Sequence, residues 1–99
     1  MKVSLTTNDS KTTVRIEGRL DTVAANDLEQ ALSPVWEQSH PDLYFDCRDM
    51  EYISSSGLRV FLKLKKYVLA QNGRLEVSEL QPMVKGVFEM TGFDKLLLS

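Results

Sequence analysis

The chain has 99 residues, with 12 Lys and Arg against 14 Asp and Glu, so its formal net charge is −2. Hydrophobic residues make up 42% and charged residues 26%, which is ordinary for a globular protein and argues against disordered, collagen-like and coiled-coil classes. We expect one domain over residues 1–99, and the mild acidity argues against a basic footprint for nucleic acid or anionic membranes.

The first third of the chain predicts a β-hairpin followed by an amphipathic helix. Residues 3–7 and 12–17 alternate apolar and polar side chains on either side of a turn sequence, and Gly18 is expected to end the second strand. Asp21 is a good helix N-cap, because its carboxylate can accept from free amide groups of the first turn. The apolar face of that helix repeats at helical spacing through Ala24, Leu28, Ala31, Leu32 and Val35.

The remaining elements alternate strand and helix. The segments are a buried strand at 42–47, a helix at 57–70, a strand at 74–77, a helix from Pro82 to Gly92, and a strand or short helix at 95–98. Helices between strands imply crossover connections. The sequence therefore predicts an α/β fold: a mixed, mostly parallel sheet with an N-terminal antiparallel hairpin and helices packed against it.

Cysteine and histidine usage narrows the class of protein further. Cys47 is the single cysteine, which excludes an internal disulfide framework and a CxxC metal site, and we expect it to be a small core residue. His40 is the single histidine and lies in a predicted loop, so we expect no metal site and no serine-hydrolase triad. Without an apolar signal segment or a stretch long enough to span a membrane, we expect a cytoplasmic protein.

A run of three serines and a glycine at residues 54–57 lies at a predicted strand-to-helix junction, where sites of α/β sheets usually form. A serine hydroxyl here can cap the following helix, and we expect Ser56 to do so. Capping explains one of the three hydroxyls and leaves the role of the other two unexplained. The functional alternative is phosphorylation, because a helix N-terminus tolerates a phosphate electrostatically.

The stretch ISSSGLRV at residues 53–60 resembles the signature of bacterial anti-sigma factor antagonists, members of the STAS domain family. The resemblance covers nearly the whole chain. Residues 18–21 resemble the family's Gly-x-Leu-Asp stretch, residues 46–53 its Asp-rich lead into the serines, and residues 82–93 its last helix with a Thr-Gly end.

The resemblance implies partner switching, in which no cofactor is expected. The unphosphorylated protein binds an anti-sigma factor that is also a serine kinase, phosphorylation releases it, and a serine phosphatase resets it. By position in the motif, the phosphoacceptor is Ser55, with Ser54 as second choice; several relatives carry Asp where this chain has Ser54. The expected partner-binding residues are Asp21, Ser54, Ser56, Gly57 and Arg59.

Three acidic residues and one basic stripe belong to the surroundings of the expected site. We expect Asp21 on the same face as the serines, with Asp46 and Asp49 as further candidates for this acidic neighbourhood. Asp46 also invites comparison with phosphate-accepting receiver domains, but the other acidic residues and the lysine of such a site are not evident. Arg59, Lys63 and Lys66 form either a solvated helix face or, at Arg59, a contact to an acidic partner or a nucleotide.

The sequence leaves other functions open beside a regulator without enzymatic activity. The chain could serve as an accessory or ligand-binding STAS module of a transport complex, in which the serine is only a cap or a contact residue. A third alternative is a constitutive scaffold in a signalling complex. Phosphorylation by a cognate kinase separates the first function from the other two.

Overall fold

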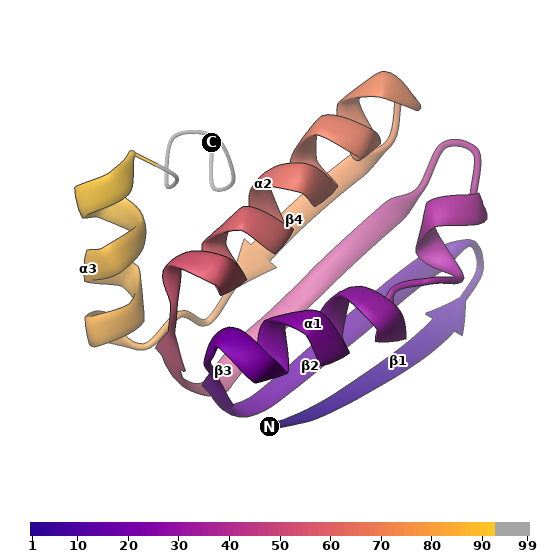
Figure 1. Cartoon of the computed structure of the whole chain (residues 1–99). Coiled ribbons are helices and arrows are strands. Elements are labelled where there is room, and N and C mark those ends of the chain that lie inside the picture. Colours follow the sequence, from indigo (N-terminus) through magenta and orange to yellow (C-terminus); the bar gives the residue numbers. More distant parts are fainter. Residues whose placement is uncertain (93–99) are drawn as a thin grey trace.

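A computed structural model describes residues 1–92 and shows a four-stranded sheet with helices on one face (Figure 1). The strands lie in the order β1-β2-β3-β4, so neighbours in sequence are neighbours in the sheet. The elements are β1 (Lys2–Asn8), β2 (Lys11–Leu20), α1 (Thr22–Ala31), a 3-10 turn (Val35–Glu37), β3 (Asp42–Ile53), α2 (Ser55–Ala70), β4 (Arg74–Ser78) and α3 (Pro82–Thr91).

The pairing of the strands confirms the predicted fold class. β1 runs antiparallel to β2, whereas β2–β3 and β3–β4 are parallel. The two parallel pairs are joined by crossovers that carry α1 and α2, which lie side by side on the same face of the sheet in Figure 1. Strands β2 and β3 are parallel, so their carboxyl ends lie at the same end of the sheet. The chain enters α1 and α2 from that end.

An aromatic row connects the sheet with α2 and α3. Phe45 of β3 lies 5.1 Å from Phe61 of α2, and Phe61 lies 5.8 Å from Phe88 of α3, measured between ring centroids. All three side chains are essentially inaccessible to solvent. Tilted and edge-to-face pairs at these separations add about 0.5–1.5 kcal/mol each beyond the burial of area, so this row anchors both helices to the centre of the sheet.

The opposite face of the sheet carries charged side chains, and no described helix covers it. Arg15 of β2 pairs with Asp49 of β3 and lies 3.7 Å from Glu17. The hydrogen bond to Asp49 is the main cause of the raised pKa of Arg15. Arg48 pairs with Asp46 at 3.5 Å, with the Arg48 guanidinium largely in solvent. Ion pairs this exposed contribute little stability, so the face serves mainly as a hydrated exterior.

The second and third strands are longer than predicted. Gly18 was expected to end its strand, but β2 continues through it to Leu20, with Gly18 at φ +96°, a backbone conformation that favours glycine. β3 was predicted to stop at Cys47 and instead reaches Ile53, with register shifts on either side of its pairing with Glu17 and Gly18. Each shift inserts one extra residue into β3, a β-bulge that the strict alternation of a strand cannot reveal.

The helical predictions are confirmed apart from two boundaries: α1 ends at Ala31, so that Val35, expected on its apolar face, begins the 3-10 turn instead, and the start of α2 differs. That helix begins at Ser55, two residues before the expected Gly57, and α3 begins at Pro82 and ends at Gly92 as predicted, with Gly92 at φ +79°. The predicted element at 95–98 lies outside the described residues. No helix within residues 1–92 is long and apolar enough to cross a bilayer.

Cys47 is a fully buried residue of β3, as expected for a core thiol. Burial, with a smaller contribution from the charge of Asp46, raises the pKa of Cys47 from 9.0 to about 12. The folded thiol therefore keeps its proton at pH values where the unfolded thiol loses it.

We predict that this difference makes the protein less stable in alkali. As pH rises from about 9 toward 12, the unfolded state is favoured by roughly 1.4 kcal/mol per pH unit from this thiol alone. Urea unfolding of the wild type and of Cys47→Ala across this range measures the effect. The difference in stability between the two proteins should shift steadily with pH, and a constant difference would contradict the prediction.

Candidate functional site

The serine segment follows β3 at the edge where β2 also ends. Leu20 and Ile53 are register partners in the two parallel strands. The amide of Ser54 donates to the carbonyl of Leu20 over 2.9 Å, which ties the start of α2 to the strand that leads into α1. Two helix N-termini are thereby brought next to each other, one entered through Asp21 and the other through Ser54.

Each helix has a side-chain cap at this edge. Asp21 Oδ1 accepts from the amide of Ala24 at 2.8 Å, which confirms Asp21 as the N-cap of α1. Ser54 Oγ accepts from the amide of Gly57 at 3.1 Å, so Ser54, and not Ser56, caps α2. The prediction of Ser56 was wrong because it placed the helix start at Gly57; Ser54 still has an extended backbone, with ψ 170°, and the helix begins immediately after it.

The other two serines of the segment differ in accessibility. Ser55 is the first residue of α2 and is exposed, whereas Ser56 is half-buried. Within residues 1–92, the Ser55 hydroxyl makes no hydrogen bond, because its neighbour Ser54 supplies the cap. The Ser55 oxygen is therefore free to meet another molecule without loss of the helix cap.

Gly57 sets how closely α2 approaches the two strands. A methyl group at this position would lie 2.9 Å from Leu20 Cγ and 2.9 Å from Ile53 Cγ1, which is inside van der Waals contact. Gly57 is buried, and its missing side chain lets the first turn of α2 rest directly on the ends of β2 and β3. This close contact determines where the serine segment lies relative to the ends of β2 and β3.

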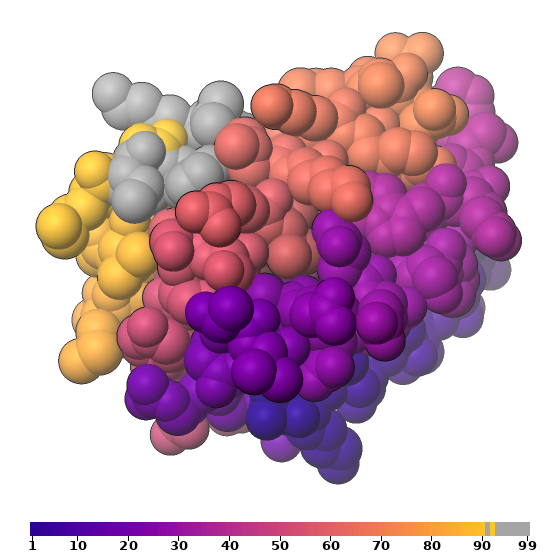
Figure 2. Space-filling model, in the orientation of Figure 1, coloured from indigo at the N-terminus to yellow at the C-terminus, as the bar shows by residue number. Residues whose placement is uncertain are grey.

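A shallow groove of about 270 Å³ runs between α1 and α2 and begins beside the serine segment. Figure 2 shows the two helices side by side on this face of the molecule. Lys63 spans the groove, since its Nζ lies 2.9 Å from Glu29 of α1 and 5.3 Å from the centre of the Trp36 ring. The residues that line the groove are Thr22, Ala25, Asn26 and Glu29 of α1 and Ser56, Arg59, Val60 and Lys63 of α2.

The residues of the predicted basic stripe differ in their ion pairs, and residues of α1 also line the groove. Lys63 is neutralised by Glu29, but Arg59 is exposed and has no ion pair within the described part of the chain. Thr22 and Asn26 were missed by sequence reasoning. They lie four residues apart at the start of α1, so the polar stripe that follows the Asp21 cap was the signal that could have found them.

Asp46 and Asp49, the further acidic candidates, do not join the site. Both belong to ion pairs on the helix-free face of the sheet, with Arg48 and Arg15 respectively. His40 is an exposed loop residue. Among residues 1–92 no three His, Cys, Asp or Glu side chains are grouped so that they could hold a metal ion.

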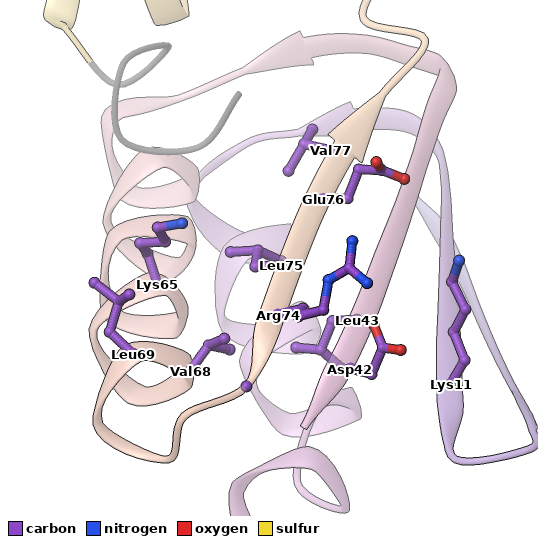
Figure 3. A pocket seen from close by; sticks show the side chains of 11 residues that line it. Lys11, Asp42, Leu43, Lys65, Val68, Leu69, Arg74, Leu75, Glu76 and Val77 are labelled. Atoms are coloured by element: carbon purple, nitrogen blue, oxygen red, sulfur yellow. The ribbon is translucent and has the colours of Figure 1, made fainter. Parts of the chain in front are cut away.

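A second cavity, of about 400 Å³, lies at the opposite end of α2 (Figure 3). In this view Leu75 and Val77 lie on the side of β4 that faces α2, whereas Arg74 lies on the other side of the strand. The cavity borders the beginnings of β3 and β4 and the last turns of α2. It is therefore separate from the serine segment, which follows the end of β3.

We predict that Ser54 and Ser56 contribute unequally to stability. Ser54→Ala should lower the free energy of unfolding by about 1 kcal/mol, because the amide of Gly57 loses its acceptor. Ser56→Ala should change it by less than about 0.5 kcal/mol. Urea titrations of both variants measure the difference, and a larger loss for Ser56→Ala would contradict the assignment of the cap.

A second prediction concerns the close approach at Gly57. Gly57→Ala should destabilise the protein by about 1–3 kcal/mol through overpacking against Leu20 and Ile53. Gly86→Ala is the matched control, because Gly86 lies in α3 with open space around it and alanine should stabilise the helix by about 1 kcal/mol. Thermal melts of both variants should therefore shift in opposite directions, and a common direction would refute the packing argument.

Comparisons with known proteins agree on one family. The sequence profile described as "STAS domain" matches residues 2–98. The chain is 32% identical over 93 residues to the "Putative anti-sigma factor antagonist BtrV" of Bordetella bronchiseptica, an alignment that covers 94% of this chain and 80% of that protein.

Solved structures share the fold. An anti-sigma factor antagonist from Mycobacterium paratuberculosis superposes with a TM-score of 0.85 at 27% identity, covering 97% of this chain and 81% of that one. The anti-sigma factor antagonist SpoIIAA in its unphosphorylated form superposes with a TM-score of 0.84 at 20% identity, covering 98% and 86%.

The family assignment rests on agreement across nearly the full length, because the profile spans residues 2–98 and the relative and the superposed structure cover 94% and 97% of this chain. It also places the chain among regulators rather than enzymes. The protein belongs to the STAS domain family and, within it, to the anti-sigma factor antagonists.

Proposed function

We propose that the protein controls transcription by partner switching through Ser55. In its unphosphorylated form it binds an anti-sigma factor that is also a serine kinase, and this binding frees a sigma factor. Phosphorylation of Ser55 releases the antagonist, and a serine phosphatase restores it. The protein acts in the cytoplasm as a binding partner and as a substrate of these enzymes.

The observation that carries this proposal is the exposed, unbonded hydroxyl of Ser55 at the start of α2. Its neighbour Ser54 is half-buried and accepts from the amide of Gly57, so modification there would disturb the cap. The accessible oxygen therefore favours Ser55 over Ser54 as phosphoacceptor. A protein of this fold, SpoIIAA, has been solved in both phosphorylated and unphosphorylated forms, a precedent for such a modification.

The covalent step requires little of this chain beyond an accessible oxygen. Ser55 Oγ attacks the γ-phosphorus of ATP, an O–P bond forms, the bond to ADP breaks, and the hydroxyl proton passes to a base of the kinase. In the reset, water attacks the phosphoserine and inorganic phosphate leaves, which regenerates the hydroxyl. Both reactions are catalysed by the partners.

Electrostatics explain why the modification would end binding. A phosphate adds about −1.5 to −2 charges at neutral pH. The new charge would lie beside the edge where Asp21 already places a carboxylate, and a partner packed over Ser55 would have to desolvate both. A loss of about 3 kcal/mol lowers affinity roughly a hundredfold, which is sufficient to exchange one partner for another.

In the unphosphorylated protein, the same surface offers contacts for the anti-sigma partner. Asp21, Ser56 and Arg59 border the groove between α1 and α2 or the edge where it begins. We place the docking surface on these residues together with Ser54 and Gly57, which hold the segment in position. A transport-complex module would not need a free hydroxyl here, so the phosphorylation experiment distinguishes the two functions.

The proposal predicts different behaviour for two substitutions of Ser55. The anti-sigma partner can be identified by co-purification with Ser55→Ala, which cannot be phosphorylated and should stay bound. With the purified partner and ATP, mass spectrometry should locate phosphate on Ser55 of the wild type. Calorimetry should show Ser55→Ala binding within about threefold of wild type and Ser55→Asp binding at least tenfold more weakly.

Lys66→Gln is the control, because Lys66 is an exposed residue of α2 outside the docking surface. It should be phosphorylated and released like the wild type. Equal affinity of Ser55→Ala and Ser55→Asp for the partner, or phosphate confined to Ser54, would refute the proposed switch. A stable complex with transporter subunits and no phosphorylation would support the accessory-module alternative.

A further inference from the structure

We propose that Arg59 is the counter-ion of the phosphorylated serine. PhosphoSer55 would pair with Arg59 across one turn of α2, and the pair would withdraw from solvent the free cation that the unmodified protein offers to a carboxylate of its partner. This inference rests on the proposed function and gives phosphorylation a second effect beyond repulsion of the partner.

The two side chains are four positions apart on one helix, with three residues between them. Residues at this spacing are neighbours on the helix surface, about 5–6 Å apart between Cβ atoms. Helical side chains also lean toward the N-terminus, so the Arg59 side chain can reach back over the turn that contains Ser55. Both residues are exposed, so no packed group stands between them and solvent.

The charges on this face leave Arg59 available. Lys63, one turn further along α2, is held by Glu29 at 2.9 Å. Arg59 makes no ion pair or hydrogen bond within residues 1–92, although it lines the groove beside Ser56. A guanidinium can donate two parallel hydrogen bonds to a phosphate. These charge-assisted bonds are stronger than the hydrogen bonds that the guanidinium makes to water.

The pair has two consequences for switching. It neutralises part of the phosphate charge, so the modified helix gains an internal ion pair instead of an isolated dianion. It also engages the single described cation of the groove that is otherwise unpaired, so a partner carboxylate that used Arg59 loses its contact. Phosphorylation thus removes an attraction and adds a repulsion in one event.

A double-mutant cycle, measured by thermal unfolding of proteins with genetically encoded phosphoserine, tests the pair without any kinase. Phosphoserine is placed at position 55 during synthesis, in the wild-type background and in Arg59→Gln, and melting temperatures are compared with those of the unmodified proteins. Phosphorylation should raise the melting temperature by about 3 °C more with Arg59 present than with Arg59→Gln, and 0.5 M NaCl should reduce this difference.

Lys66→Gln is the matched control. Lys66 is an exposed cation on the same face of α2, eleven residues from Ser55 and therefore about 16 Å along the helix. Its removal should leave the effect of phosphoserine unchanged. A second readout is the Nε–H signal of Arg59 in NMR spectra, which should shift on phosphorylation.

The outcomes separate this inference from the proposed function. Equal effects of phosphoserine in the wild type and in Arg59→Gln, together with an unmoved Arg59 Nε–H signal, would overturn the pairing. Failure of a cognate kinase to modify Ser55 would overturn the proposed function, while the double-mutant cycle would still report on the pair.

Discussion

The hydrogen bond from the Ser54 amide to the Leu20 carbonyl joins the two crossovers of this fold at one point. It forms because β2 and β3 are parallel and end in register, so the chain must enter α1 and α2 from adjacent positions. Gly57 completes the junction, since only a residue without a side chain lets α2 rest on Leu20 and Ile53. The cap, the exposed hydroxyl and the groove between the helices all depend on this junction.

Rigidity at the junction suits a regulatory surface. The core beneath it is continuous from Phe45 through Phe61 to Phe88, and Tyr67 of α2 donates to the Trp36 carbonyl at 2.7 Å, which fixes α2 to the turn after α1. A modification at an exposed helix start can therefore change charge without a change of fold. The proposed switch is electrostatic in origin, and the domain serves as its fixed support.

Sequence reasoning reached the fold class, the Asp21 cap and both ends of α3, because each depends on local chemistry: alternation of strands and helices, a carboxylate before a helix, proline at a start and glycine at an end. It failed where tertiary structure overrides local pattern. Buried residues of β3 fall at Phe45, Cys47, Met50 and Ile53, so two bulges change a period of two into a period of three. The cap was misplaced to Ser56 for a related reason, because three consecutive serines carry no local signal for which one has extended backbone.

Separate oxygens perform capping and the proposed regulation, and this separation determines which substitutions the segment tolerates. The position before the acceptor needs only a side chain that accepts from the amide of Gly57. Aspartate and serine meet this requirement about equally well. An aspartate at position 54 would therefore cap α2 about as well as serine does, and such a substitution would leave the neighbouring hydroxyl undisturbed.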